Sequence, residues 1–459
     1  MRRLEQEFPD ALTVVGVHAG KYPNERVTAQ IALAAQRLGV AHPIVNDRQF
    51  RTWRRYEVQA WPTLVFVGPK GDYLGSHAGE ATFEGLAHAL GELVAAAERR
   101  GELRRGLGPG GPPPAHDAGV GVPRAVPDAD GTPAPAEGVL RFPSKVVAAG
   151  HDRLFVADTG HERVLGVRLA GPGAAAVEVV IGSGESGLQD GPFGAARFTH
   201  PHGLAFDGHT LYVADTGNHC IRAADLETRT VRTLAGTGER GNIAPWKPAP
   251  GRDVALASPW DLALVGRQVY VAMAGFHQLW QLDLAEETVQ VFAGSGREHV
   301  TDGILRGAML AQPSALAAAG DRLYFADAES SAVRWADLAT PFGERAVHTI
   351  VGTGLFDFGD RDGEGDDVRL QHVAGLAPWG DGLVIADTYN HRLKLVDPAT
   401  RRVTTWTSAE ACGGLNEPEG VAVTAGGVVV ADTNHHRLVV VEAGPATLQP
   451  TCRVLSLTA

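Results

Sequence analysis

A short stretch that occurs six times limits the fold of this chain more than any other feature of its sequence. It is clearest as Val-Ala-Asp-Thr-Gly-Asn-His at 213–219, and imperfect copies begin at Val156, Val271, Phe325, Ile385 and Val430. The distance from Asp158 to Asp432 gives a mean period of about 55 residues, enough for four short strands and their turns. Four antiparallel strands form one blade of a β-propeller, so the sequence predicts a six-bladed propeller over residues 139–459.

The second copy shows how one repeat divides into strands. Apolar and β-branched runs at 203–206, 211–214, near Ile221 and at 230–235 are separated by turn residues, and Gly236-Thr237-Gly238 closes the unit. Glycine allows the positive φ that such a closing turn needs. The same Gly-x-Gly turn follows three other copies, so we expect an all-β fold throughout this region.

The repeated aspartates are expected to be structural. A carboxylate at the end of the second strand can accept N–H groups from the turn into the third strand, and buried polar groups need partners. The alternative is a ring of carboxylates around the channel. We give the structural interpretation to Asp158, Asp215, Asp327, Asp387 and Asp432. We interpret the histidines that follow in the same way: His219, His277, His391 and His436.

The stretch Asp387–Arg392, which reads Asp-Thr-Tyr-Asn-His-Arg, resembles the NHL repeat. Five good copies and one poor copy extend from Leu140 to Ala459. The deviating copies at 272–278 and 326–331 resemble repeats of the NHL repeat-containing protein 2 family. That resemblance implies a thioredoxin-like domain ahead of the propeller.

Residues 1–103 alternate between strand and helix patterns. The apolar runs Thr13–Val17 and Thr63–Val67 predict buried strands, and Tyr73–Gly79 predicts another. Asn24 and Thr82 are each expected to cap a helix with an apolar face. This order predicts an α/β domain with a parallel or mixed sheet covered by helices on both faces.

The sequence Trp61-Pro62-Thr63 resembles the cis-proline loop of thioredoxin-like proteins. Cis peptide bonds occur almost only before proline, and this one would expose backbone for strand-like pairing with a peptide. The alternative is a trans proline at the start of a strand. We predict that these three residues contact a partner.

The resemblance also implies a Cys-x-x-Cys turn and its preceding strand, yet the first cysteine is Cys220. Thiol–disulfide exchange needs a reactive thiolate and a resolving thiol. Two explanations stay open. In one, the catalytic strand lies upstream of Met1 and the protein is a thiol–disulfide oxidoreductase; in the other, residues 1–103 are a degenerate domain kept as a docking surface.

Composition narrows the class of partner and of compartment. Residues 104–138 are rich in Gly, Pro and Ala and are predicted to form a flexible linker. A net charge of −12 argues against nucleic-acid or acidic-membrane partners. Cys220, Cys412 and Cys452 are too scattered for a disulfide framework or a zinc site, which favours a reducing, cytoplasmic compartment. No stretch approaches the ~20 apolar residues that a membrane helix requires.

The acidic loop at 360–367 spaces oxygen ligands as calcium loops do, but it lacks the glutamate of the EF-hand at the twelfth position, which is Gln371. A solvated turn is therefore favoured. Comparable turns at Asp190-Gly191 and Asp302-Gly303 indicate a repeated loop structure.

The first residues of the six innermost strands should face the channel mouth: Ser144, His202, Trp260, Ser314, Ala374 and Glu419. Only His202 and Glu419 could bind a metal, and they belong to blades 2 and 6, so they are not neighbours around the ring. A metal-dependent hydrolase or lyase would need three or four converging ligands. A polar and aromatic recognition surface anchored on Trp260 is the better prediction.

The sequence as printed therefore predicts a non-catalytic scaffold that binds a protein partner through Trp61, Pro62, Thr63, His202, Trp260 and Glu419. No catalytic residue, metal or cofactor is predicted. The thiol–disulfide oxidoreductase and the propeller hydrolase or lyase are the alternatives.

Overall fold

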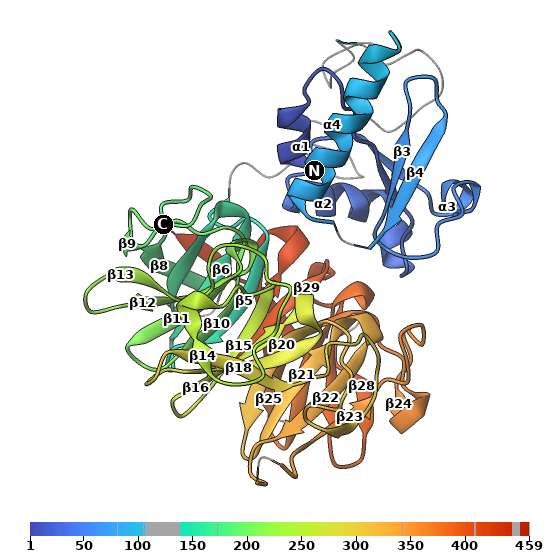
Figure 1. Cartoon of the computed structure of the whole chain (residues 1–459). Helices are drawn as coiled ribbons and strands as arrows, with labels where there is room; N and C mark the ends of the chain where they lie inside the picture. Colours follow the sequence, from blue (N-terminus) through green and yellow to red (C-terminus); the bar gives the residue numbers. More distant parts are fainter. Residues whose placement is uncertain are drawn as a thin grey trace. The chain divides into compact units, whose positions relative to one another are not determined.

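The computed structural model describes residues 1–79, 81–103, 105, 138–171, 173–341, 343–407, 410–442 and 450–458. Its contacts divide the chain into two compact units, Met1–Ala136 and Glu137–Ala459 (Figure 1). The predicted linker at 104–138 lies almost entirely outside the described residues. An α/β unit followed by a six-bladed propeller confirms the predicted fold class.

The N-terminal unit alternates short strands with helices. Its elements are α1 (Arg2–Glu7), β1 (Gly16–His18), α2 (Thr28–Arg37), β2 (Ile44–Asn46), α3 (Arg51–Arg55), β3 (Thr63–Val67), β4 (Tyr73–Ala78) and α4 (Phe83–Arg99). β1 and β2 pair in parallel, whereas β3 and β4 are antiparallel. Thr82 caps α4 as predicted, because its Oγ1 accepts the Gly85 N–H at 3.2 Å.

Two predicted details of this unit are wrong. Asn24 does not cap a helix but opens the single 3-10 turn η1 (Asn24–Arg26), and the residue before α2 is Val27, which makes no side-chain capping bond. The strand expected at Thr13–Val17 is reduced to β1 and starts three residues later. Among the described residues, β1–β2 and β3–β4 form separate two-stranded sheets.

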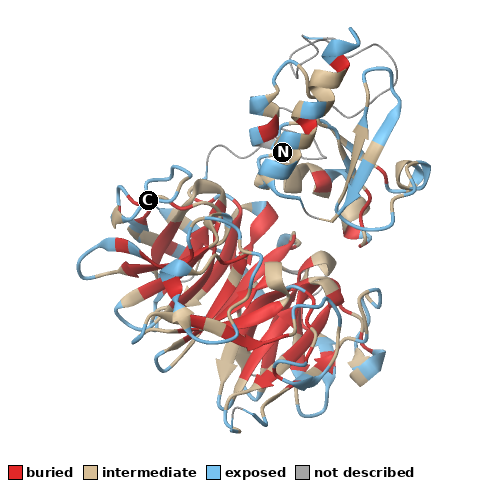
Figure 2. Ribbon diagram, viewed as in Figure 1, coloured by how far each residue is buried: buried red, intermediate tan, exposed pale blue. Residues whose placement is uncertain are grey.

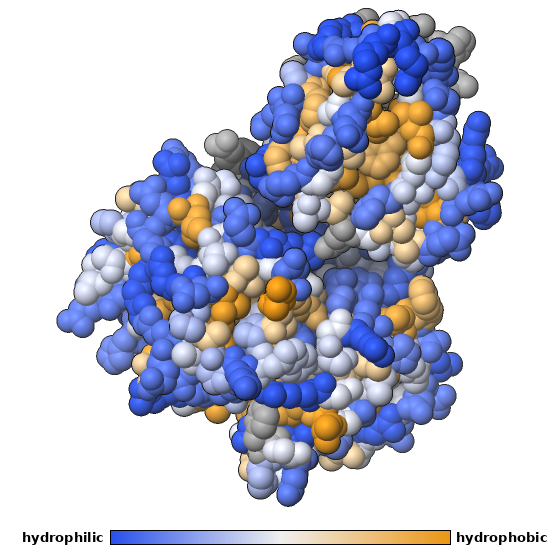
Figure 3. All heavy atoms as spheres, in the orientation of Figure 1, coloured by the Kyte–Doolittle hydropathy of each residue, from blue (hydrophilic) through white to orange (hydrophobic). Residues whose placement is uncertain are grey.

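Much apolar surface of the N-terminal unit is exposed to solvent. Val15, Val17 and Val67 are each about half exposed, and Figure 3 shows hydrophobic residues gathered on the visible face of this unit. Strands normally bury one face against another layer. The core of this unit is therefore small, and Figure 2 shows little burial in it compared with the propeller.

Six four-stranded antiparallel sheets form the propeller blades. Blades 1 and 2 are β5 (Pro143–Ala148), β6 (Arg153–Asp158), β7 (Arg163–Leu169) and β8 (Ala174–Ile181), then β10 (Pro201–Phe206), β11 (Thr210–Asp215), β12 (Cys220–Asp225) and β13 (Thr230–Ala235). Blades 3 and 4 are β15 (Pro259–Val265), β16 (Gln268–Met273), β17 (Gln278–Asp283) and β18 (Thr288–Ala293), then β20 (Pro313–Ala319), β21 (Arg322–Asp327), β22 (Ala332–Asp337) and β23 (Ala346–Val351). Blades 5 and 6 are β25 (Val373–Trp379), β26 (Gly382–Asp387), β27 (Arg392–Asp397) and β28 (Arg402–Thr405), then β29 (Pro418–Thr424), β30 (Gly427–Asp432), β31 (Arg437–Glu442) and β32 (Thr451–Val454). Six apolar clusters, one between each pair of neighbouring blades, hold the ring together.

Within the described residues, a fifth strand extends five of the six sheets. In blades 2 to 5 it has two residues and comes from the loop ahead of the blade: β9 (Gly191–Pro192), β14 (Ala249–Pro250), β19 (Gly303–Ile304) and β24 (Gly363–Glu364). In blade 1 it is the C-terminal strand β33 (Ser456–Thr458), which pairs in parallel with β8. This strand helps to seal the ring.

Side-chain bonds close the same seam between blades 6 and 1. Phe142 N–H donates to His436 Nδ1 at 3.0 Å, and the Thr433 hydroxyl donates to the Pro143 carbonyl at 2.8 Å. His219 and His391 accept the N–H of Ser258 and Glu417 in the following blades in the same way. These three repeat histidines thus link neighbouring blades, which fits the structural interpretation, whereas the Nδ1 of His277 is buried without a hydrogen-bond partner among the described residues.

The repeated aspartates bind different donors from those predicted. Asp215 Oδ1 accepts the N–H of Thr199, which lies in the loop before the first strand of the same blade and not in the turn into the third strand. Its Oδ2 accepts hydrogen bonds from Asn218 Nδ2 and Arg222 Nη1. The other four aspartates each accept an equivalent N–H: Asp158 from Arg141, Asp327 from Ala311, Asp387 from Gln371 and Asp432 from Asn416. In these five blades the carboxylate therefore ties the start of the blade to its middle strands.

A buried cation joins this aspartate to the Asp-Gly turns. Arg222 lies between Asp215 and Asp190, Arg334 between Asp327 and Asp302, and Lys394 between Asp387 and both Asp360 and Asp362. The same turn aspartates accept from a threonine of the outer strand: Thr233, Thr349 and Thr405. The turns are a repeated loop structure, as predicted, and the acidic loop at 360–367 uses its carboxylates within this structure.

Burial changes the pKa values of these groups. Loss of solvent raises the pKa of Asp215 and Asp387 to about 6, against the lowering effect of the neighbouring cations. Burial also lowers the pKa of Lys394, but the carboxylates around it, Asp387 first, raise that pKa by more. Both partners are therefore charged at neutral pH.

Candidate functional site

The inner ends of the blades form the candidate site. Each first strand has a register irregularity near its start, for example between Pro201 and Leu204 in blade 2 and between Pro259 and Asp261 in blade 3. A bulge lets successive side chains leave a strand on the same side. In the structure, two consecutive positions of these strands make contacts across the ring.

Three of the predicted partner-binding residues meet at this site. His202 Nε2 lies 3.2 Å from Glu419 Oε2, and the His202 ring packs on Trp260 with a centroid distance of 4.9 Å. His202 and Glu419 are nearly buried, whereas Trp260 is half-buried. His202 and Glu419 belong to blades that are not neighbours, as expected, and they meet because side chains from non-adjacent blades reach each other across the narrow centre of the ring.

The next position of the first strands carries an ion pair that crosses the channel. Lys145 of blade 1 lies 3.4 Å from Asp261 Oδ2 of blade 3, and it donates to the carbonyls of Ser314 at 2.8 Å and Ala374 in blades 4 and 5. Asp261 also accepts the N–H of Leu316 at 3.0 Å. All these contacts are buried, so the channel is filled at this level.

Small residues make room for this ion pair. The positions equivalent to Lys145 and Asp261 in the other blades are occupied by glycine or alanine: Gly203, Ala315, Gly375 and Gly420. A Cβ on Gly203 would lie 2.4 Å from Asp261 Cα. Neither Lys145 nor Asp261 is predicted by the repeat motif. A signal for them exists, since one lysine and one aspartate stand among four small residues at the same repeat position.

The remaining predicted contact residues lie in the N-terminal unit. The Trp61–Pro62 peptide bond is cis, and Trp61 is half exposed. Its indole N–H donates to the Ala19 carbonyl at 2.8 Å, and its ring lies 4.5 Å from that of Trp53. Thr63 opens β3, and its hydroxyl donates to the Ala60 carbonyl. This loop is held in place by its own side chains.

The described residues offer little for a metal site, a reactive thiol or a membrane-spanning helix. No three His, Cys, Asp or Glu side chains among them are arranged to hold a metal ion. Burial raises the pKa of the Cys220 thiol to about 11, which makes this cysteine a poor nucleophile. None of the described helices is long and apolar enough to cross a membrane.

Comparisons with known proteins agree with this architecture. The NHL repeat family matches residues 198–223 and 415–441, which cover the first three strands of blades 2 and 6. NHL repeat-containing protein 2 of Gallus gallus is 35% identical over 92% of this chain and 60% of its own length. The Homo sapiens protein of the same name is 36% identical, over 86% of this chain and 55% of its own length.

A plant protein is similar over the same extent. Protein SUPPRESSOR OF QUENCHING 1, chloroplastic, of Arabidopsis thaliana is 36% identical over 92% of this chain and 40% of its own length. The chain thus spans about half the length of the relatives that it matches. These matches include the α/β unit as well as the propeller. The chain belongs to the NHL repeat-containing protein 2 family.

Proposed function

We propose that this chain is a non-catalytic scaffold for protein recognition, with the partner-binding surface on the propeller around His202, Trp260 and Glu419. The observation that carries this proposal is the meeting of an imidazole, an indole and a carboxylate at the inner ends of blades 2, 3 and 6. Such mixed polar and aromatic groups are typical of the residues that contribute most to protein interfaces.

The contacts around this cluster support recognition at a surface. The Lys145–Asp261 pair fills the channel one residue further along the first strands. A ligand that binds at His202, Trp260 and Glu419 therefore cannot pass deeper into the channel. Trp260 is half-buried: packing on His202 orients its ring, and part of it can still contact a partner. A ring that is already oriented loses little side-chain entropy on binding.

The cysteines of this chain favour a scaffold over an oxidoreductase. The N-terminal unit contains no cysteine, Cys412 and Cys452 form a disulfide, and Cys220 is buried with a raised pKa. We further propose that residues 1–103 are a thioredoxin-like unit that adds a second contact through Trp61, Pro62 and Thr63. The cytoplasmic location stays a prediction.

Replacement of Trp260 tests the proposal. The full chain and its Trp260→Ala variant, immobilised at equal density, are used to purify binding proteins from the source organism, and the affinity of each identified protein is then measured by interferometry. We expect one protein to bind the unmodified chain and to lose about tenfold or more in affinity for the variant, since buried tryptophans commonly contribute 2 kcal/mol or more.

The matched control is Trp246→Ala, which removes another partly exposed tryptophan of the same propeller. It should leave the affinity unchanged, and circular dichroism should show equal folding of all three proteins. A partner that binds both variants as well as the unmodified chain would contradict the proposed surface. Trp61→Ala, measured in the same way, reports separately on the contact in the N-terminal unit.

A further inference from the structure

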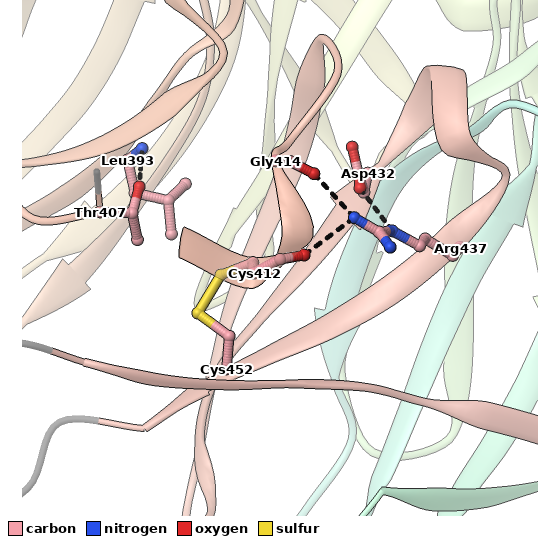
Figure 4. Close-up of a disulfide and its surroundings, with 7 residues drawn as sticks. All are labelled: Leu393, Thr407, Cys412, Gly414, Asp432, Arg437 and Cys452. Atoms are coloured by element: carbon pink, nitrogen blue, oxygen red, sulfur yellow. Dashed lines mark hydrogen bonds and ion pairs between the residues drawn. A yellow bond between two sulfur atoms is a disulfide. The ribbon is translucent and has the colours of Figure 1, made fainter. Parts of the chain in front are cut away.

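A disulfide fastens the last blade of the propeller. Cys412 lies in the 3-10 turn η9 (Ala411–Gly413), between the outer strand of blade 5 and the first strand of blade 6, and it is bonded to Cys452 of β32 (Figure 4). The two cysteines are 40 residues apart in the sequence. The spacing of the three cysteines argues against a disulfide framework, and it does not reveal this single pair, because only the fold shows that β32 returns along the blade to the loop that precedes it.

This disulfide stands where the neighbouring blades have an edge strand. In blades 2 to 5, a valine of the outer strand pairs with the short strand from the preceding loop: Val231 with Gly191, Val289 with Ala249, Val347 with Gly303 and Val403 with Gly363. By register against the third strand, Cys452 opposite Val441 occupies the position of Val231 opposite Ala224. Within the described residues, blade 6 has no edge strand. The disulfide replaces hydrogen bonds with one covalent bond.

The disulfide is accessible to another molecule. It lines a cavity of about 380 Å³ together with Gly413, Arg437, Pro450 and Val454, and both cysteines are only half-buried. The four equivalent valines, by contrast, are buried. A disulfide that exchanges with thiols needs such access, whereas a bond that only strengthens the core does not.

The arginine of this cavity is held in a fixed position. Arg437 Nε donates a hydrogen bond to Asp432 Oδ2 at 2.6 Å. Its Nη2 donates to the carbonyl oxygens of Cys412 and Gly414 at 3.0 and 2.7 Å (Figure 4). Because the charge of Arg437 is paired with Asp432, this arginine fixes the turn that carries Cys412 and thereby one wall of the cavity.

The disulfide also helps to hold β33 in place. β33, which completes the sheet of blade 1, begins only four residues after Cys452. With the disulfide formed, β32 is fixed to the preceding loop, and β33 is kept close to β8. Without it, β32 is held mainly by its ladder with β31, and the seam of the ring loses a covalent attachment.

We propose that Cys412–Cys452 is a thiol–disulfide exchange site for a dithiol protein of the Cys-x-x-Cys class, and that its reduction loosens the closure of the ring. A thiolate of the dithiol attacks one sulfur and forms a mixed disulfide, while the other cysteine leaves as a thiolate. The second thiol of the reductant then attacks the mixed disulfide and releases the remaining cysteine. Two electrons and two protons pass from the dithiol, which ends as a disulfide, to the two cysteines, which end as thiols.

Trapping of the mixed disulfide tests the exchange step. The oxidised full chain is incubated with a thioredoxin whose resolving cysteine is replaced by serine, and adducts are mapped by mass spectrometry. We expect a covalent adduct on Cys412 or Cys452 and none on Cys220, which serves as an internal control because it is a free, buried thiol and offers the attacking thiolate no disulfide. An oxidised, folded chain that forms no adduct at either cysteine overturns the proposal.

Hydrogen exchange tests the structural consequence. After reduction with dithiothreitol, amide exchange in residues 451–458 should be about tenfold faster or more, while β13, which an edge strand covers, should not change. The Cys412→Ser/Cys452→Val variant restores the residue of the other blades and should be insensitive to dithiothreitol. Equal exchange in 451–458 before and after reduction contradicts the loosening of the ring, and a response of the double variant contradicts the assignment to this bond.

Discussion

The Arg222→Met variant is expected to lose about 3–5 kcal/mol of the free energy of unfolding, because removal of one partner of a buried ion pair leaves the other charge uncompensated. Arg222 is fully buried, and it donates to Asp215, Asp190 and the carbonyls of Arg197 and Gln189. Methionine has a similar length, so the volume of the site is nearly kept while four hydrogen bonds are lost. Urea unfolding followed by circular dichroism measures the change.

Blade 3 supplies the matched control for this prediction. At the positions of Asp215 and Arg222 it has Met273 and Trp280, both fully buried, so an apolar pair can serve the same place in the fold. The double variant Asp215→Met/Arg222→Met should therefore be less destabilised than the sum of the two single variants. Additive effects, or a loss below about 1 kcal/mol in Arg222→Met, would show that the ion pair does not carry the blade in this way.

Gly375→Ala is the second variant with a large expected effect. A Cβ at this position would lie 1.8 Å from the carbonyl oxygen of Glu419 in the next blade, and backbone cannot move aside as a flexible side chain can. We expect a loss of at least about 3 kcal/mol, at the upper end of the usual cost of overpacking, because two blades must separate. The same urea unfolding measurement applies.

Gly194→Ala is the control for this substitution, since its Cβ would meet no atom within 4 Å. It should change the free energy of unfolding by no more than about 0.5 kcal/mol. If the two alanine variants are equally stable, the blades are not packed as closely at Gly375 as the structure indicates.

The parts of the fold that local sequence determines are predicted well. Each repeat carries its own turns and β-branched strands, so the number of blades follows from the spacing of five aspartates and one methionine. The Thr82 cap is likewise local, since its donor is three residues away. Asn24 fails as a cap because tertiary contacts place a separate 3-10 turn there, and a short motif cannot reveal this.

Contacts that depend on how the ring closes are predicted poorly. The meeting of His202 with Glu419, the N–H donors of the repeat aspartates and the pairing of Cys412 with Cys452 all join residues from different loops or blades. The order of blades around a ring gives their neighbours, but it does not give the width of the channel. That width depends on the small residues such as Gly375, whose effect appears only in three dimensions.

The parallel pairing of β33 with β8 has a consequence for biosynthesis. Blade 1 leaves the ribosome well before β33, the strand that completes its sheet. Blades 2 to 5 can therefore assemble on the nascent chain while the outer edge of blade 1 is open to other strands. Binding of chaperones during translation should accordingly concentrate on β8 until β33 has emerged.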